Sequence, residues 1–376
     1  MKNKIINVFY HNLLVGRLAE TPQKLCAFEY SPGWLADGFS ISPFKLPLQK
    51  KVFIAEREPF SGNFGVFDDS LPDGWGRLLV DRLLIKKHIN PAEVSLLDRL
   101  AIVGSSGMGA LEYQPVEKFV PNVKVGNIKE LAVEAEAILN ENYSGNLEEL
   151  VKVAGSSGGA RPKVLIKIDG DDWLIKFRSS LDYKDIGKLE FKYSEAARTA
   201  GLEMPETRLF EGKFFGVKRF DRKSNGKKVF MISASGLLHA SHRVPTLDYS
   251  DLMMLTLKLT RDYNEVAKMF RLMCFNVFAY NRDDHSKNFS FLYDADRWQL
   301  APAYDLVYSE GLGGEHATMI AGEGKNPSEK DILNVAGKAN LDRRTAENIM
   351  EEVLAAVKKA KIVNFERSTR FNYQNY

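Results

Sequence analysis

The residues with the clearest capacity for chemistry lie in one short polar stretch, NRDDHSKN at positions 281–288, between two apolar segments. Polar side chains enclosed in this way are costly to bury, so we expect the stretch to have a function. Asp283 can accept or orient a hydroxyl proton. Asn288, five positions later, and Asp305, after the next apolar segment, carry the oxygen atoms that Mg²⁺ prefers as ligands. The stretch therefore predicts a proton-accepting carboxylate beside a divalent-metal site.

A second candidate site is the run Gly155, Ser156, Ser157, Gly158 and Gly159. The backbone N–H groups of such a turn can bind phosphate, because no side chain blocks the approach. The run is not a Walker A sequence, since GxxxxGK[ST] does not occur in the chain. It also matches G-x-S-x-G, the nucleophile elbow of serine hydrolases, which requires a strand before the serine and a helix after it. A proline and a predicted β-hairpin follow instead, so we favour a phosphate loop or a plain flexible turn.

The glycine run is followed along the sequence by a lysine on a predicted strand and by glutamates on a predicted helix. Lys176 ends the second strand of the predicted hairpin, and Glu190 and Glu195 lie on the next predicted helix. Taken singly, such a lysine is usually a snorkelling residue and such a glutamate a solvated one. Protein kinases, however, place a phosphate-binding lysine one hairpin after a glycine-rich loop and pair it with a helix glutamate.

The polar stretch fits the same order. The spacing of Asp283 and Asn288 is that of the kinase catalytic loop, H-R-D-x-x-x-x-N, with Arg282 directly before the aspartate. Asp305 has the place of the metal-binding aspartate of kinases, although alone it could be a helix N-cap. We interpret His285 as a loop-packing residue rather than a base. Five elements in this order predict a protein kinase.

Local patterns predict the elements that position these residues. Apolar strands at 164–168 and 173–177 flank Asp169-Gly170, a hairpin turn. A helix over 188–200 ends at Gly201 with a proline beyond it. A second hairpin turns at 211–212, a buried helix extends over 264–280, and strands FSFLY and WQLAPAY pair through a turn at 294–297.

The N-terminal part is expected to be rich in strands and turns. The pattern predicts a hairpin of 5–10 with 13–18 and a loop at 60–73. Helices are predicted at 78–88, at 92–104, at 127–140 and shortly before Val151. Pro115, Pro121 and the polar residues between them indicate a linker.

Composition limits the class of protein. The chain has 376 residues, enough for about two to three domains. A formal charge of +3 is too balanced for a dedicated nucleic-acid binder, and two thiols cannot make a disulfide framework or a four-ligand zinc site. No apolar run approaches the ~20 residues that span a bilayer. We therefore expect a soluble cytoplasmic protein with no membrane association.

At these residues the sequence resembles the HipA family of bacterial serine/threonine kinases, the toxins of HipA–HipB toxin–antitoxin pairs. The matching segments, which extend from about residue 60 to 310, are FDDSLPDGWGRLLVDRLL, VAGSSGGARPKVLIK, WLIKF, VKRFDR, NRDDHSKNFSFL and LAPAYDLVYS. The resemblance implies an α+β fold. A β-rich N-terminal subdomain (1–120) would precede a two-lobed protein-kinase-like fold, with the glycine-rich loop in its N-lobe (121–244) and a mainly helical C-lobe (245–376).

The resemblance also implies roles for individual residues in an ATP- and Mg²⁺-dependent kinase. Asp283 resembles the catalytic aspartate and Lys176 the phosphate-binding lysine, while Asn288 and Asp305 resemble the Mg²⁺ ligands. Glu190 is preferred to Glu195, because it has the family's spacing to the helix-closing glycine. The hinge that meets adenine falls at Lys218, Arg219 and Phe220, and the glycine run 155–159 would hold the phosphates.

Regulation and partners follow from the resemblance alone. The family autophosphorylates a serine of its phosphate loop, which disorders the loop and switches the kinase off. Lys152 has the aligned position here, so Ser156 and Ser157 are the candidates. The implied partners are a cytoplasmic protein substrate and a small helix-turn-helix antitoxin of HipB type, which would make most of any nucleic-acid contact. Alternatives are a nucleotide-binding pseudokinase acting as an interaction module, a small-molecule kinase, and a serine hydrolase with Ser157 as nucleophile.

Overall fold

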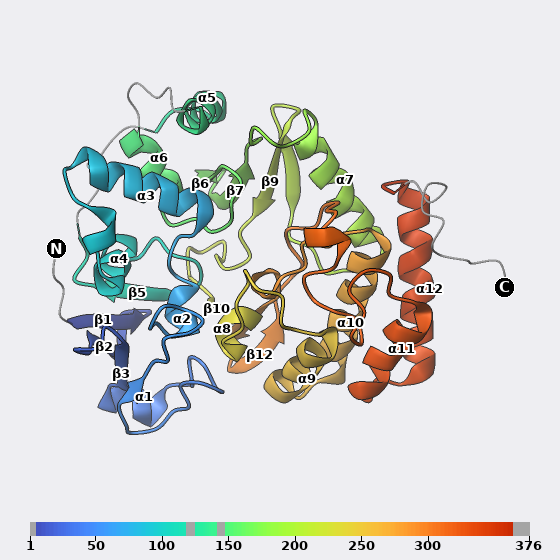
Figure 1. Cartoon of the computed structure of the whole chain (residues 1–376), viewed down its shortest axis with the longest axis horizontal. Helices are drawn as coiled ribbons and strands as arrows, with labels where there is room; N and C mark the ends of the chain where they lie inside the picture. Colours follow the sequence, from blue (N-terminus) through green and yellow to red (C-terminus); the bar gives the residue numbers. More distant parts are fainter. Residues whose placement is uncertain (1–4, 118–124, 141–146, 364–376) are drawn as a thin grey trace. The chain divides into compact units, whose positions relative to one another are not determined.

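The computed structural model describes residues 5–117, 125–140 and 147–363 and divides into two compact units (Figure 1). The first unit contains Met1–Gly187, Arg208–Ile232 and Gly236–His239, and the second contains the remaining segments. Helices and antiparallel strands are mixed, so the predicted α+β class is confirmed. Within the described ranges, no helix is long and apolar enough to cross a membrane.

A five-stranded antiparallel sheet forms the beginning of the first unit. Its strand order is β4-β3-β2-β1-β5. The strands are β1 (Ile5–Tyr10), β2 (Leu13–Glu20), β3 (Cys26–Tyr30), β4 (Phe53–Ile54) and β5 (Leu111–Gln114). Ile6, Leu18, Phe28 and Phe53 are successive cross-strand partners, and all four are buried. One face of the sheet therefore carries the core, as the alternating sequence predicts.

The helices of the first unit begin and end at local capping signals. They are α1 (Pro32–Asp37), α2 (Gly65–Asp68), α3 (Gly74–Lys86), η1 (Pro91–Glu93), α4 (Leu96–Val103), α5 (Ile128–Leu139) and α6 (Leu147–Ala154). The helix predicted at 127–140 is confirmed, with Asn127 as its N-cap. The helix predicted at 92–104 is wrong in extent, because Ser95 and Asp98 form a capping box that starts α4 after η1. The loop predicted at 60–73 contains α2, and Pro121 of the predicted linker lies outside the described residues.

A second sheet, with strand order β6-β7-β9-β8, completes the first unit. Its strands are β6 (Lys163–Ile168), β7 (Asp171–Lys176), β8 (Thr207–Phe210) and β9 (Phe214–Lys218), so both predicted hairpins are confirmed. Val164, Trp173 and Ile175 are fully buried against helices α3 and α6. Side chains alternate across a strand. The opposite face of this sheet therefore presents Leu165 and Leu174, which remain half-buried.

Helices dominate the second unit. The remaining elements of the chain are α7 (Ile186–Thr199), β10 (Phe230–Ser233), α8 (Ala234–Leu238), α9 (Tyr249–Thr260), α10 (Tyr263–Phe278), η2 (Ser286–Asn288), β11 (Ser290–Asp294), β12 (Arg297–Leu300), η3 (Leu312–Gly314), α11 (Glu329–Lys338) and α12 (Arg343–Ala360). Helix α10 packs against α9 and α12 (Figure 1). Most of its side chains are buried, which confirms the predicted buried helix. Tyr193 of α7 donates a hydrogen bond to the carbonyl of Ala279 at 2.8 Å, fixing the end of α10.

His239 makes the stability of the first unit depend on pH. Its Nε2 accepts a hydrogen bond from the Gly65 N–H at 3.3 Å, and its ring packs edge-on against Phe60. Burial, aided by the positive charge of Lys45, lowers the pKa of His239 to about 4. An unfolded histidine has a pKa of about 6.5, so between about pH 6.5 and 4 the unfolded chain binds a proton that the folded protein does not.

We therefore expect the free energy of unfolding to fall by about 1–2 kcal/mol across this window, a value reduced for the partial exposure of the ring. Urea unfolding at pH 7 and at pH 4.5 measures the effect. The His239→Asn variant, whose side chain tolerates the left-handed backbone at this position, should lose this part of the pH dependence. An equal drop in the wild type and the variant would contradict the prediction.

Candidate active site

The polar stretch after α10 folds back on itself. Residues Ser286–Asn288 form the short helix η2, which brings the side chain of Asn288 towards Asp283. Asn288 Nδ2 donates to the backbone carbonyl of Asp283 at 2.7 Å. The Asp283 carboxylate itself is 65% exposed. The structure therefore brings these two predicted residues together, with the carboxylate accessible and the amide oxygen of Asn288 not occupied by this contact.

The neighbouring aspartate anchors the stretch. Asp284 is fully buried, and its Oδ2 accepts from the Tyr249 hydroxyl at 2.7 Å and lies 2.9 Å from His316 Nδ1. Its Oδ1 accepts from the Ala317 N–H at 2.9 Å. Burial, followed by the nearby Asp284 charge, raises the pKa of Tyr249 well above its usual value. These bonds fix the orientation of the stretch, so that Asp283 faces outwards while Asp284 faces the core.

Asp305 lies beyond the hairpin of β11 and β12. Strand β12 ends at Leu300, so the predicted strand WQLAPAY is too long. The hydroxyl of Tyr304 bonds to the carbonyl of Lys287 and to Ser290 Oγ, each at 2.6 Å, and so holds this segment beside the polar stretch. Asp305 has a φ of 56°, and no helix begins there, which excludes the N-cap alternative. Such a backbone conformation in a non-glycine residue is uncommon and is often found at functional sites.

The oxygen atoms of Asn288 and Asp305 suit a magnesium ion. The described part of the chain contains no group of three or more histidine, cysteine or acidic side chains arranged to hold a metal. Mg²⁺ is commonly held by one or two protein oxygen ligands together with substrate phosphates rather than by an all-protein cage. An amide oxygen and a carboxylate that need phosphate oxygens to complete the shell fit this pattern.

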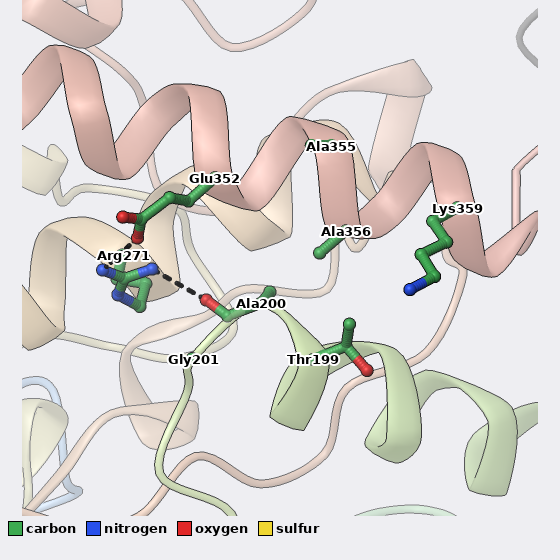
Figure 2. Close-up of a pocket in the computed structure, with 8 residues that line it drawn as sticks. All are labelled: Thr199, Ala200, Gly201, Arg271, Glu352, Ala355, Ala356 and Lys359. Carbon is green, nitrogen blue, oxygen red and sulfur yellow. Dashed lines mark hydrogen bonds and ion pairs between the residues drawn. The ribbon is translucent and has the colours of Figure 1, made fainter.

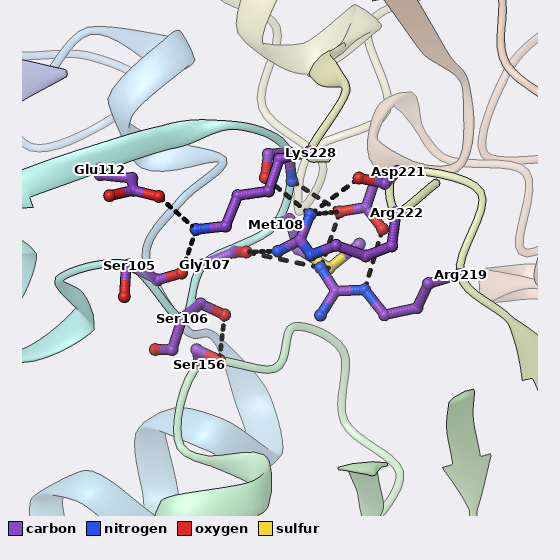
Figure 3. Close-up of polar contacts among 11 residues, drawn as sticks. Ser105, Ser106, Gly107, Met108, Glu112, Ser156, Arg219, Asp221, Arg222 and Lys228 are labelled. Carbon is purple, nitrogen blue, oxygen red and sulfur yellow. Dashed lines mark hydrogen bonds and ion pairs between the residues drawn. The ribbon is translucent and has the colours of Figure 1, made fainter. Parts of the chain in front are cut away.

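The glycine run connects α6 to β6 in the first unit. A helix precedes Ser157 and a strand follows, the reverse of a nucleophile elbow, so the structure excludes the hydrolase motif. Ser157 is buried, and its hydroxyl donates to the carbonyl of Ala154 at 2.6 Å. The hydroxyl of Ser156 donates to the carbonyl of Ser106 at 2.8 Å (Figure 3). Gly159 has a φ of 77°, a conformation that glycine adopts without strain.

Lys176 lies on the half-buried face of the second sheet. It is the last residue of β7, and its ammonium lies 5.7 Å from the centre of the Phe215 ring. The strand register places Leu165, Leu174 and Val217 on the same face. A lysine beside an apolar surface and a glycine turn can bind a phosphate group and a flat apolar ring together.

The predicted hinge continues from β9. The Lys218 side chain forms an ion pair with Asp171 at 2.7 Å. The Arg219 N–H donates to the carbonyl of Asp172 at 2.8 Å, which extends the pairing of β9 with β7. Phe220 follows and is half-buried. The backbone of this segment therefore lies at the end of the same sheet as Lys176.

The structure distinguishes the two helix glutamates. Glu190 on α7 is 2% exposed, whereas Glu195 is exposed and forms an ion pair with Arg198 on the same helix. A buried carboxylate requires polar or charged neighbours, so Glu190 is the better candidate for pairing with a functional lysine. Lys176, the glycine run and the hinge lie in the first unit. The second unit contains Glu190, Asp283, Asn288 and Asp305.

Sequence reasoning missed a buried charge cluster beside the glycine run (Figure 3). Asp221 accepts hydrogen bonds from Arg219, from Arg222 and from the Gly109 N–H at 2.7–2.9 Å. Lys228 donates to the carbonyl of Ser105 and pairs with Glu112. The charged residues of the segment VKRFDR were visible in the sequence. Their partners at 105–112 were not predictable, because they are more than 100 residues away in the sequence.

A pocket of about 400 Å³ lies elsewhere in the second unit (Figure 2). Its lining comes from the end of α7, from α10 and from α12. Arg271 lines the pocket and donates to the carbonyl of Ala200 and to Glu352, each at 2.8 Å. None of the predicted site residues lines this pocket. We therefore do not include it in the candidate active site.

Comparison with known proteins gives two family matches. Residues 6–114 match the HipA N-terminal domain, and residues 155–361 match the HipA-like C-terminal domain. A Sinorhizobium fredii protein named "Putative kinase Y4mE" is 27% identical over 345 residues, which cover 82% of this chain and 78% of that protein. A second, "Putative kinase Y4dM", is 26% identical over 201 residues, covering 46% of this chain and 48% of that protein.

A solved structure shares the fold. It is that of the HipA, HipB and operator DNA complex of the Shewanella oneidensis MR-1 toxin–antitoxin system. The TM-score is 0.73 at 18% sequence identity, over 98% of this chain and 92% of the matched chain. At this identity, the likeness establishes the architecture of the chain and nothing about its ligands.

Proposed function

Because the chain belongs to the HipA family of serine/threonine kinases, we propose that it transfers the γ-phosphoryl group of ATP to a serine or threonine of a cytoplasmic protein, with Mg²⁺ as cofactor. One observation carries the proposal most directly. Asn288 bonds to the backbone of Asp283, while Asp284 anchors the same loop in the core. This leaves an accessible carboxylate and an amide oxygen on one loop that is anchored in the core, as a kinase catalytic loop requires.

The proposed chemistry is an in-line displacement. The acceptor hydroxyl oxygen forms a bond to the γ-phosphorus, the bond from that phosphorus to the β–γ bridging oxygen breaks, and ADP leaves. Asp283 orients the hydroxyl and takes its proton. Lys176 and the backbone of 155–159 hold the phosphates, and Glu190 is proposed as the helix glutamate of the kinase. Mg²⁺ held by Asn288 and Asp305 would neutralise charge on the phosphates.

The binding and regulatory parts of the proposal rest on the first unit. The backbone of Lys218 and Phe220 is proposed to meet adenine, beside the half-buried face of the second sheet. Ser156 and Ser157 are the candidates for autophosphorylation. Ser156 is the more accessible of the two, and Ser157 is buried, so we favour Ser156 as the acceptor.

We further propose a partner and a domain division. The matched Shewanella HipA was solved with HipB and operator DNA, which supports a small helix-turn-helix antitoxin as the partner of this chain and as the main contact with nucleic acid. The proposed domains are an N-terminal subdomain (1–120), a kinase N-lobe (121–244) and a helical C-lobe (245–376). The boundary at residue 120 lies outside the described residues.

The test is a phosphate-transfer assay on the purified full chain. With ATP labelled on the γ-phosphate, we expect label in the protein itself or in an added substrate protein, recovered as phosphoserine or phosphothreonine. EDTA should abolish the transfer and excess Mg²⁺ should restore it. The Asp283→Ala variant controls for a co-purifying kinase. Equal incorporation by the variant and the wild type, or labelling of Ser157 by a fluorophosphonate, would reject the assignment.

A further inference from the structure

The glycine run is held from two sides by charged residues to which the proposed function gives no role. Asp73 lies directly before α3, and its carboxylate accepts a hydrogen bond from the Gly159 N–H. Lys163 begins β6, and its ammonium donates to the carbonyl of Gly158 at 2.6 Å. One anion and one cation therefore meet at two adjacent glycines of the phosphate loop.

Lys163 stands opposite Lys176. The two residues are cross-strand partners in β6 and β7. The neighbouring pair, Pro162 and Phe177, is hydrogen-bonded, since the Phe177 N–H donates to the carbonyl of Pro162 at 2.7 Å. Hydrogen-bonded and non-hydrogen-bonded pairs alternate in antiparallel strands, so the two lysines form a non-hydrogen-bonded pair, in which the side chains are closer. Like charges directly opposite destabilise a sheet, and Lys163 is only 6% exposed. Two ammonium groups on one face of the hairpin make that face favourable for a negatively charged group.

Asp73 is brought to the loop by close backbone packing. A Cβ atom at Gly74 would lie 2.4 Å from the carbonyl oxygen of Gly159, so only glycine allows this approach. The Trp75 N–H donates to the same carbonyl at 2.9 Å. The Asp73 carboxylate therefore binds the loop N–H as an anion ligand, in the manner in which a phosphate oxygen binds such a group.

We propose that the Gly159 N–H and Lys163 form a second phosphate-binding point of the loop, for which the Asp73 carboxylate and a nucleotide phosphate compete. This inference rests on the proposed function, because it assumes that the loop receives ATP. Lys163 then increases the affinity for phosphate, while Asp73 decreases it, both by occupying the N–H group and by repelling the incoming negative charge.

The test compares ligands that differ in phosphate number. ATP, ADP and adenosine are titrated calorimetrically into the wild type, Asp73→Asn and Lys163→Gln. Asp73→Asn should bind ATP about fivefold more tightly, and Lys163→Gln about tenfold more weakly. The change should be smaller for ADP and within about twofold for adenosine, since adenosine has no phosphate. Thermal unfolding of each variant confirms that it is folded.

Matched controls make the same charge changes elsewhere in the first unit. Asp37→Asn removes an exposed carboxylate at the end of α1, and Lys167→Gln removes an exposed ammonium on β6. Neither should change any affinity. If Asp73→Asn binds ATP as weakly as, or more weakly than, the wild type, or if adenosine responds as strongly as ATP, the competition is rejected. If the wild type binds none of the three ligands, the proposed function fails instead.

Discussion

Replacing Asp283 by asparagine is expected to lower kcat for phosphoryl transfer by about 10²–10⁴-fold, while the affinity for ATP stays within about threefold. The amide keeps the size of the side chain but cannot accept the hydroxyl proton. Asp283 has no assigned contact with the nucleotide, so ground-state binding should not change. Its 65% exposure predicts a change in the free energy of unfolding of less than about 0.5 kcal/mol. Single-turnover kinetics and calorimetric ATP titration measure the two effects.

Asp296→Asn is the matched control for this variant. Asp296 lies in the turn between β11 and β12, in the same unit, with a left-handed backbone that asparagine tolerates. The control should retain full activity. If Asp283→Asn stays active, or if it loses ATP binding as strongly as it loses activity, then Asp283 is not the catalytic carboxylate.

The adjacent carboxylates of Asp283 and Asp284 differ in burial, and we therefore propose a different role for each. Asp284 is buried and receives hydrogen bonds from groups near residues 249 and 317, so removing it would leave several donors unsatisfied. The Asp283 side chain is exposed, and the network around Asp284 anchors the loop that carries it. A kinase loop needs both kinds of residue, because a reactive carboxylate is effective only when its position is fixed.

Elements with strong local signals were predictable from the sequence. The turn Asp169-Gly170 takes positive φ values at both positions, as its composition indicates, and it fixes the β6–β7 hairpin. Asn127 caps α5 at the predicted residue. These features depend on a few adjacent residues and on backbone preferences that hold in any protein.

Other element boundaries depended on competing local signals. The apolar run after residue 92 favoured one long helix, yet Ser95 with Asp98 forms a capping box inside it. The sequence S-x-x-D was therefore available as a start signal, and the apolar periodicity outweighed it in the prediction. Strand β12 ends at Leu300, and the segment after it is held by a tertiary contact, the hydrogen bond from the Tyr304 hydroxyl to the carbonyl of Lys287.

Some features of the candidate site could likewise be predicted from the sequence, and others could not. The spacing of Asp283 and Asn288 was visible, because both belong to one short loop. The position of Lys163 opposite Lys176 could also have been derived, since the predicted turn sets the register of the hairpin. The partners of Asp284 could not, because Tyr249 and His316 are each more than 30 residues away in the sequence.

Of the variants proposed here, Asp221→Asn is expected to lower the free energy of unfolding most, by about 3–5 kcal/mol. Burial would raise the pKa of Asp221, but Arg219 and Arg222 outweigh it and hold the pKa below its usual value. Asparagine would leave two buried guanidinium groups without the counter-charge that bonds to both of them. Urea denaturation, followed by a probe of the first unit, measures the loss. This stabilisation is present above about pH 4 and is lost as the pH falls through the folded-state pKa.

Two further variants separate the charge effect from a general loss of packing. Asp169→Asn, at an exposed turn whose ion pair with Arg208 is 3.9 Å long, should cost less than about 0.5 kcal/mol. The double variant Asp221→Asn, Arg222→Gln removes one of the uncompensated charges and should be more stable than Asp221→Asn alone. A double variant that is less stable than the single one would show that the cluster acts through shape and not charge. Arg222 also donates to the carbonyl of Gly107, and Asp221 accepts a hydrogen bond from the Gly109 N–H. The cluster therefore joins the segment after β9 to the turn whose Ser106 carbonyl accepts a hydrogen bond from Ser156. Loss of the cluster should therefore loosen the glycine run at 155–159 before the helical unit unfolds.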